Sequence, residues 1–170
     1  MSSRAHGKMH QVSVTATKNG SGEVKFEPDS KVWNHSDGEF VFRKDEHGMR
    51  KDDYHLLEFV LDDQTGDGLK FPSSPHEAMW VAPVEDRANP QCPDKDTRSD
   101  YEVIEPICVA DEGERLIVRN HNPKQQHWAF TLNFVKRGED QANADRYVSW
   151  DPIINNGNGG AGGTGTGTFG

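Results

Sequence analysis

The stretch of sequence that decides the fold is Trp128-Ala-Phe-Thr-Leu-Asn-Phe-Val135. Its largest apolar side chains occupy every second position, at Trp128, Phe130, Leu132 and Phe134. A period of two places them on one face of a β-strand, whereas a helix would need a period near 3.6. We therefore predict a strand here whose apolar face, Trp128 included, lies in the hydrophobic core.

The same alternation recurs on both sides of this stretch. Val12, Val14 and Ala16 share one face of a predicted strand, and Leu57, Phe59 and Leu61 share one face of another. Shorter extended runs are predicted at 24–26, 40–42, 69–71, 79–81, 101–109, 115–120 and 147–150. Apolar residues nowhere follow helical spacing over a useful length. The pattern predicts an all-β, antiparallel β-sandwich of roughly seven to nine strands with long polar loops, or a related open barrel.

Composition divides the chain into three parts. We expect a flexible N-terminal segment over residues 1–10, a β-sandwich domain over 11–154, and a low-complexity tail over 155–170 that is rich in glycine. The stretch from Pro83 to Asp100, rich in Pro, Asp and Asn, predicts a long irregular loop, and residues 138–146 predict at most one helical turn.

Charge and hydropathy exclude several classes of partner. The 19 Lys and Arg residues face 28 Asp and Glu residues, for a net charge of -9. Basic residues alternate with acids, as in Arg43-Lys44-Asp45-Glu46, so we expect no nucleic-acid partner. No run approaches the roughly 20 apolar residues of a membrane span, and no apolar stretch follows the first residues, so we predict no membrane partner and a cytoplasmic location.

The two cysteines do not form a disulfide framework. Cys108 stands in an apolar run and is predicted to be a small core residue, whereas Cys92 is predicted to lie in a loop. A single bridge between them remains an alternative.

The sequence contains no recognisable catalytic constellation. HExxH, CxxC and GxSxG motifs are absent, so we predict a protein that is not an enzyme and needs no cofactor. Cys108 with His121 and His127 invites comparison with copper proteins, but no Met follows Met79 to complete such a site. The candidate contact residues for a ligand or partner are Trp33, Asn120, His121, His127 and Phe169.

One loop has partial calcium-site character. Asp63, Thr65 and Asp67 occupy the first, third and fifth positions of a calcium loop, and Gly68 occupies the sixth. Position twelve is Ser74, where the bidentate Glu should stand. Asp and Gly also favour ordinary turns, so a plain turn and a weak calcium site are both open.

Three segments carry a resemblance to a known family. Glu105-Pro106 and Asp151-Pro152 resemble the two dipeptides that name the DP-EP family of uncharacterised bacterial proteins. The run from Leu57 to Phe71 is similar in pattern, so the resemblance covers about Gln11 to Asn156 and leaves out the glycine-rich tail. It implies no activity, because no function is established for that family.

Together these features predict a non-enzymatic β-sandwich interaction module whose partner is a protein. The partner could be a second copy, because Thr164 to Phe169 is small enough to add to an exposed strand edge, with Phe169 as its anchor. The alternative is a small-ligand or carbohydrate-binding domain, in a calcium-assisted form through Asp63 and Asp67. A hydrolase built on Glu102 and Glu105 is a third interpretation.

Overall fold

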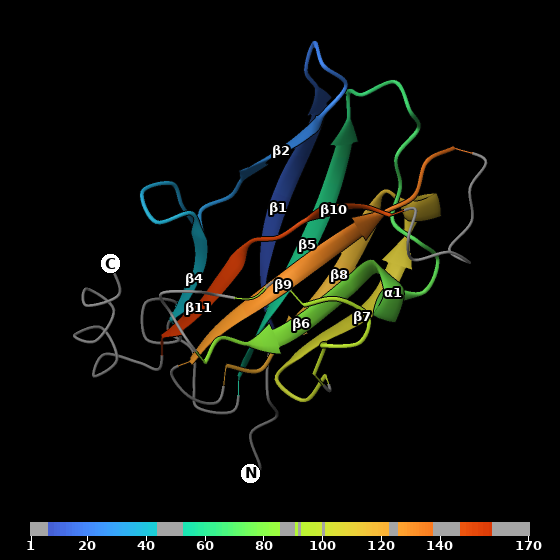
Figure 1. Ribbon diagram of the computed structural model, residues 1–170. Helices are drawn as coiled ribbons and strands as arrows, with labels where there is room; N and C mark the ends of the chain where they lie inside the picture. The colour runs from blue at the N-terminus through green and yellow to red at the C-terminus, as the bar shows by residue number, and fades with distance from the viewer. Residues whose placement is uncertain are drawn as a thin grey trace.

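The computed structural model describes residues 7–43, 53–85, 91, 93–99, 101–122, 126–137 and 147–157, without the side chains of 155 and 157. Two sheets pack face to face, which confirms the all-β, sandwich-like fold (Figure 1). The strands are β1 (Gly7–Lys18), β2 (Val24–Asp29), β3 (Trp33–Asn34), β4 (Glu39–Arg43), β5 (Tyr54–Asp63), β6 (Met79–Pro83), β7 (Ile104–Ala110), β8 (Arg115–Asn120), β9 (Gln126–Phe134), β10 (Val148–Trp150) and β11 (Ile153–Gly157). Helical structure within these ranges consists of α1 (Pro75–Ala78) and the 3₁₀ turn η2 (Asp111–Gly113).

The first sheet has the strand order β2-β1-β5-β8-β7, and the second has the order β10-β9-β11-β4-β3, with β6 also paired to β9. Most neighbours are antiparallel, but β1 pairs with β5 in parallel and so does β4 with β11. The prediction of a wholly antiparallel sandwich was therefore wrong in this respect. The physical reason is the route of the chain: between β1 and β5 it passes through the second sheet, and parallel neighbours need such a long crossover.

The described residues form eleven strands, more than the seven to nine predicted. The two that the sequence hid are β3, which has only two residues, and β11, whose polar end was counted with the tail. The N-terminal boundary was also wrong, because residues 7–10 belong to β1 and pair with β5. Residues 1–6 and 158–170, and the turn expected at 138–146, lie outside the described ranges.

The core lies between the two sheets and is built mainly from the alternating faces identified in the sequence. Trp128, Phe130, Leu132 and Phe134 all belong to it, which confirms the prediction for β9. Phe40 and Phe59 are fully buried across the interface, with ring centroids 6.0 Å apart in an edge-on arrangement. Such aromatic pairs stabilise a core beyond the burial of their area.

Cys108 corrects another prediction. Its side chain is exposed in β7, next to a register shift between Pro106 and Cys108, and is not a core residue. The bulge explains the change, because one extra residue reverses which side chains face the core. Cys92 lies outside the described residues, so a bridge between the two stays a prediction.

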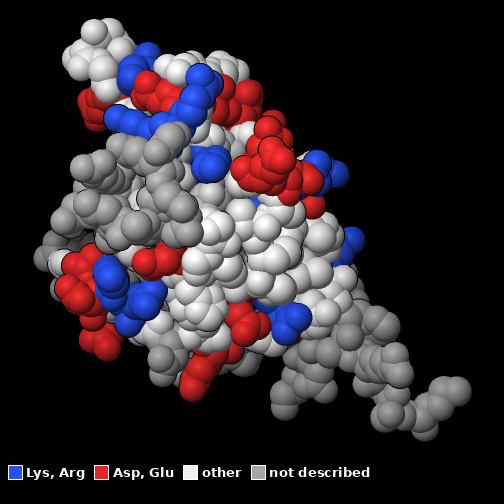
Figure 2. Space-filling view, turned by 90° about the vertical axis from the view of Figure 1, so that its right-hand side faces the viewer, with Lys and Arg blue, Asp and Glu red and all other residues white. Residues whose placement is uncertain are grey.

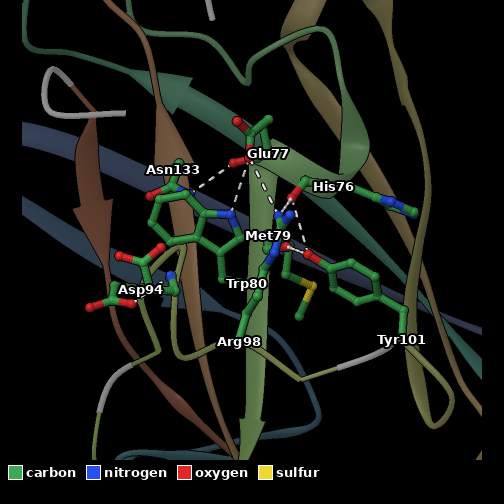
Figure 3. A network of polar contacts seen from close by, with 9 residues as sticks. His76, Glu77, Met79, Trp80, Asp94, Arg98, Tyr101 and Asn133 are labelled. Atoms are coloured by element: carbon green, nitrogen blue, oxygen red, sulfur yellow. Dashed lines mark hydrogen bonds and ion pairs between the residues drawn. The ribbon is translucent and has the colours of Figure 1, made fainter. Parts of the chain in front are cut away.

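Polar contacts hold the described part of the loop between β6 and β7 against the start of β6. The Tyr101 hydroxyl lies 2.7 Å from the Met79 carbonyl oxygen and 3.0 Å from that of His76. The Arg98 guanidinium donates to the His76 carbonyl at 3.1 Å and lies 3.5 Å from the Glu77 carboxylate. Figure 3 shows Arg98 and Tyr101 converging on this point from the loop. The described part of the loop is irregular, as predicted, and it is positioned by these side chains together with the Ser99 amide, which donates to the Val81 carbonyl of β6 at 2.7 Å.

The charge distribution agrees with the mixed composition. On the face shown in Figure 2, acidic and basic side chains are interleaved around an uncharged central area. That face therefore carries no continuous basic surface of the kind that binds phosphate backbones. Among the described residues, no helix has the length and apolar character needed to cross a membrane.

Candidate functional site

The strand β1 has a neighbour on both sides over only part of its length. β5 pairs with it from Gly7 to Ala16, whereas β2 pairs with it only from Ser13 to Lys18. β2 ends at Asp29, opposite Ser13, and the chain then crosses to the second sheet, where β3 begins. Residues 7–12, here called the open half of β1, therefore have a strand neighbour on one side only among the described residues.

The hydrogen-bond pattern shows which residues face the open side. The Gln64 amide donates to the Ala16 carbonyl at 2.8 Å, so Ala16 directs its backbone groups toward β5. Backbone direction alternates along a strand, and Met9 and Gln11 therefore direct their N–H and C=O groups away from β5. In the described ranges, no backbone group pairs with Met9 or Gln11 on that side. An unpaired row of this kind is a template for an added strand.

A groove runs along this edge. Its volume is about 670 Å³, and it is open to solvent. The Met9 side chain is 49% exposed, which makes it one of the few large apolar side chains at the described surface. The lining residues come from β1, from the end of β2 and from the crossing chain after it: Lys8, Met9, His10, Gln11, Ser13, Asp29, Ser30 and Lys31. The groove thus joins backbone hydrogen-bonding groups, an apolar side chain and two lysines.

Behind the open half lies a buried polar network that begins with a histidine pair. His10 Nε2 lies 2.9 Å from His55 Nδ1, and both side chains are buried. On the other side of the His55 ring, Nε2 lies 3.5 Å from Asn122 Nδ2, which also donates to the Phe42 carbonyl at 3.2 Å. These contacts connect β1 and β5 of the first sheet to β4 of the second.

A pair of asparagines makes a second connection between the sheets. Asn120 Nδ2 donates to Asn156 Oδ1 at 2.7 Å, and Asn156 Nδ2 donates to Asn120 Oδ1 at 3.0 Å. The Asn122 amide adds a third bond to Asn120 Oδ1 at 3.1 Å. Because β8 and β11 lie in different sheets, this pair ties the sandwich together at the end where β1 and β5 begin and β11 ends (Figure 1). Hydrogen bonds between the two sheets therefore hold the strands behind the open half of β1 in place.

The predicted contact residues are not gathered at one surface. Asn120 is fully buried and His127 is 5% exposed, so neither side chain lies at the described surface, and their contact with a ligand stays a prediction. Trp33, expected to be exposed, is half-buried, with its ring centroid 4.7 Å from that of Phe40. His121 is half-buried beside Tyr54, and its role as a contact residue stays a prediction. Phe169 lies outside the described residues.

The loop with calcium character has the hydrogen bonds of a turn. Asp63 accepts from the Thr65 amide at 3.0 Å, the Thr65 hydroxyl at 2.5 Å and the Leu69 amide at 2.8 Å. Burial raises the pKa of Asp63, but these bonds and one from the Gly68 amide outweigh it and hold the pKa below its ordinary value.

The second acid of that loop is also engaged. Asp67 Oδ2 lies 2.7 Å from Lys18 Nζ, an ion pair that neutralises the carboxylate. Among the described residues, no group of three or more His, Cys, Asp or Glu side chains is placed to hold a metal ion. The plain-turn interpretation accounts for the positions of Asp63, Thr65 and Asp67.

Sequence reasoning missed the open half of β1. Its only local signal is His10, which stands in phase with Val12, Val14 and Ala16 and so falls on the buried face of the same strand. The length of β2 relative to β1, which leaves the edge open, is a property of strand pairing that no single segment encodes.

The sequence matches no protein-family model, and no curated protein matches it. The resemblance to the DP-EP family therefore stays a prediction. In the structure, Pro106 is buried within the edge strand β7, and Pro152 is buried between β10 and β11, where its carbonyl accepts from the Phe130 amide at 3.1 Å. Both are places where a missing N–H is tolerated.

Proposed function

We propose that the protein is a non-enzymatic interaction module that binds protein partners, copies of itself included, by accepting an extended segment at the open half of β1. The observation that carries this proposal is the outward direction of the Met9 and Gln11 backbone groups, two donors and two acceptors in strand geometry. Main-chain hydrogen bonds of this kind supply affinity in strand addition, and neighbouring side chains supply selectivity.

The side chains around the groove suit a peptide better than a small ligand. Met9 offers an apolar contact, and Lys8 and Lys31 flank it with Asp29. The groove is open rather than enclosed, whereas small-molecule sites are concave and bury most of their ligand. The net charge of -9 argues against nucleic acid as the partner, and a cytoplasmic location stays a prediction.

The alternative of a calcium-assisted carbohydrate-binding domain has less support. It depended on an exposed Trp33 and on free oxygen ligands at Asp63 and Asp67. Trp33 instead packs against Phe40 and Trp150, and both carboxylates already have partners in the chain.

Selection of short linear peptides displayed on phage, with the full chain as target, tests the proposal. Gln11→Pro removes the N–H that faces the open side and no bond to β5, so the strand itself should persist. We expect peptides selected on the natural chain to bind Gln11→Pro about tenfold more weakly or not at all.

Gln11→Thr is the matched control. It also loses the side-chain contact of Gln11 with Glu58, at 3.1 Å, but keeps the backbone N–H. It should bind the selected peptides like the natural chain, and far-ultraviolet circular dichroism should show both variants folded. Equal binding to all three proteins, or a selection that yields no binder, would contradict the proposed function.

A further inference from the structure

We infer that the segment occupying the open half of β1 is Thr164–Phe169 of a second copy of this chain. This inference rests on the proposed function and names the partner for the same groove. It joins the unpaired edge with the sequence of the chain beyond β11, which ends at Gly157.

The sequence of this segment is suited to a strand. It reads Thr164-Gly-Thr-Gly-Thr-Phe169, with threonine and glycine alternating at a period of two. Threonine is β-branched and favours extended backbone. In an extended conformation all the threonines would share one face. Gly165 and Gly167 would leave the other face without side chains except at Phe169, which also falls on it. Its six residues span about 20 Å, the same as the six residues of the open half.

The alternation also matches the two faces of β1. Met9 and Gln11 have their side chains on the exposed outer face, whereas His10 and Val12 face the buried side. An added strand has the same alternation as its neighbour. We place the threonines beside Met9 and Gln11, where they meet solvent. Gly165 and Gly167 then fall beside Val12 and His10, where the crossing chain at 30–31 borders the groove and side chains would have least room. Phe169 falls beside Lys8, at the lower end of the groove.

The end of β11 can be placed relative to the groove. Asn156 bonds Asn120, Asn120 is opposite His55 in the sheet, and His55 is opposite Lys8. The chain therefore leaves β11 at the level of Lys8, at the lower end of β1. An antiparallel occupant, the more stable arrangement, must enter at the upper end, beside Val12.

This geometry favours a second copy over the chain's own segment. The upper end of the groove is four residues above Lys8, about 13 Å, and the sheets lie about 10 Å apart. Three strand spacings of about 4.8 Å separate β8 from a strand added beside β1, so the direct path is about 22 Å. Only seven residue steps separate Gly157 from Thr164, and a chain reversal uses about three of them. The remaining four span about 13 Å, which is too short. Two copies that exchange segments avoid the reversal and fill both grooves in a closed dimer.

Two measurements on the full chain test this inference. Light scattering after size exclusion gives the oligomeric state, and amide hydrogen exchange gives the protection of individual N–H groups. We expect a dimer in which the Met9 and Gln11 amides exchange at least about tenfold more slowly than in a chain ending at Gly157. The Lys8 and His10 amides, which face β5, should exchange alike in both.

Two proline variants locate the contact. Gln11→Pro removes an N–H of the edge, and Thr166→Pro removes an N–H of the segment. Each alone should be monomeric at concentrations where the natural chain is a dimer, while the matched Gln11→Thr and Thr166→Val should still dimerise. A mixture of Gln11→Pro and Thr166→Pro should form a heterodimer, because one intact edge then meets one intact segment.

The remaining outcomes overturn the inference. A dimer that persists in both proline variants would place the contact elsewhere. A monomer with protected Met9 and Gln11 amides would assign the groove to the chain's own segment. A monomer with fast exchange at both amides would leave the groove without this occupant. Whichever of these outcomes is found, the phage selection tests the proposed function independently, because it uses peptides unrelated to the chain's own segment.

Discussion

Replacing Asn120 by alanine tests how the two sheets are held together beneath the open half of β1. The substitution removes a fully buried amide that makes three hydrogen bonds, two with Asn156 and one with the Asn122 amide. It leaves the oxygen and a donor of Asn156 and the N–H of Asn122 without these partners, in a site from which solvent is excluded.

The expected cost follows from that count. Each buried polar group left without a partner costs about 1–3 kcal/mol, so three such groups predict a loss of roughly 3–9 kcal/mol. Asn156→Ala should cost less, about 1–3 kcal/mol, because Asn120 Oδ1 keeps its bond from the Asn122 amide. The double variant should cost less than the sum, since the second substitution removes the groups that the first left unpaired.

Equilibrium unfolding in urea measures these differences as changes in midpoint at constant slope. Gln11→Ala, which removes an exposed contact with Glu58, is the control and should change the free energy of unfolding by less than about 1 kcal/mol. The reasoning is refuted if Asn120→Ala and Asn156→Ala each cost no more than this control, or if their effects simply add.

Three further predictions concern other parts of the fold. Gly113 has φ +96°, and an added Cβ would lie 2.8 Å from its nearest side-chain atom, so Gly113→Ala should lower the free energy of unfolding by about 1–3 kcal/mol. Gly20→Ala, with nothing within 4 Å, should change it by no more than about 0.5 kcal/mol, and equal effects in urea would contradict this explanation. The pKa of Asp63 is lowered in the folded state, so the stabilisation from this carboxylate is complete above about pH 4 and is lost as the pH falls through the folded-state pKa. Asp63→Asn should therefore flatten the acid side of a plot of urea midpoint against pH. An unchanged slope would contradict this prediction. Tyr101→Phe should cost about 1–2 kcal/mol by removing the bond to Met79. It should also remove a tyrosine absorbance change with a midpoint above pH 10, because burial is the main cause that raises the Tyr101 pKa, partly offset by Arg98. An unchanged absorbance titration above pH 10 would refute the assignment.

The sequence by itself determined where most strands lie and which face of each is buried. In β9, β1 and β5 the apolar side chains occupy every second position, and a strand places such residues on one face without reference to the rest of the chain. The identification of Trp128 as a core residue followed from this local rule. The rule weakened where the signal is short or polar, as in β3 and the Asn-rich end of β11, and at the bulge that turns Cys108 outward.

Only the tertiary structure decided which strands are neighbours and therefore where the site lies. The parallel pairing of β1 with β5, the end of β2 at Asp29 and the resulting open half depend on pairing between segments far apart in sequence. The same holds for Asn120 and His127, which are next to a loop in sequence but are both buried, Asn120 in β8 of the first sheet and His127 in β9 of the second. Side-chain periodicity is a short-range property of one strand, whereas an unpaired edge or a buried amide pair exists only after distant strands have met, because pairing is set by the packing and chain closure of the whole domain.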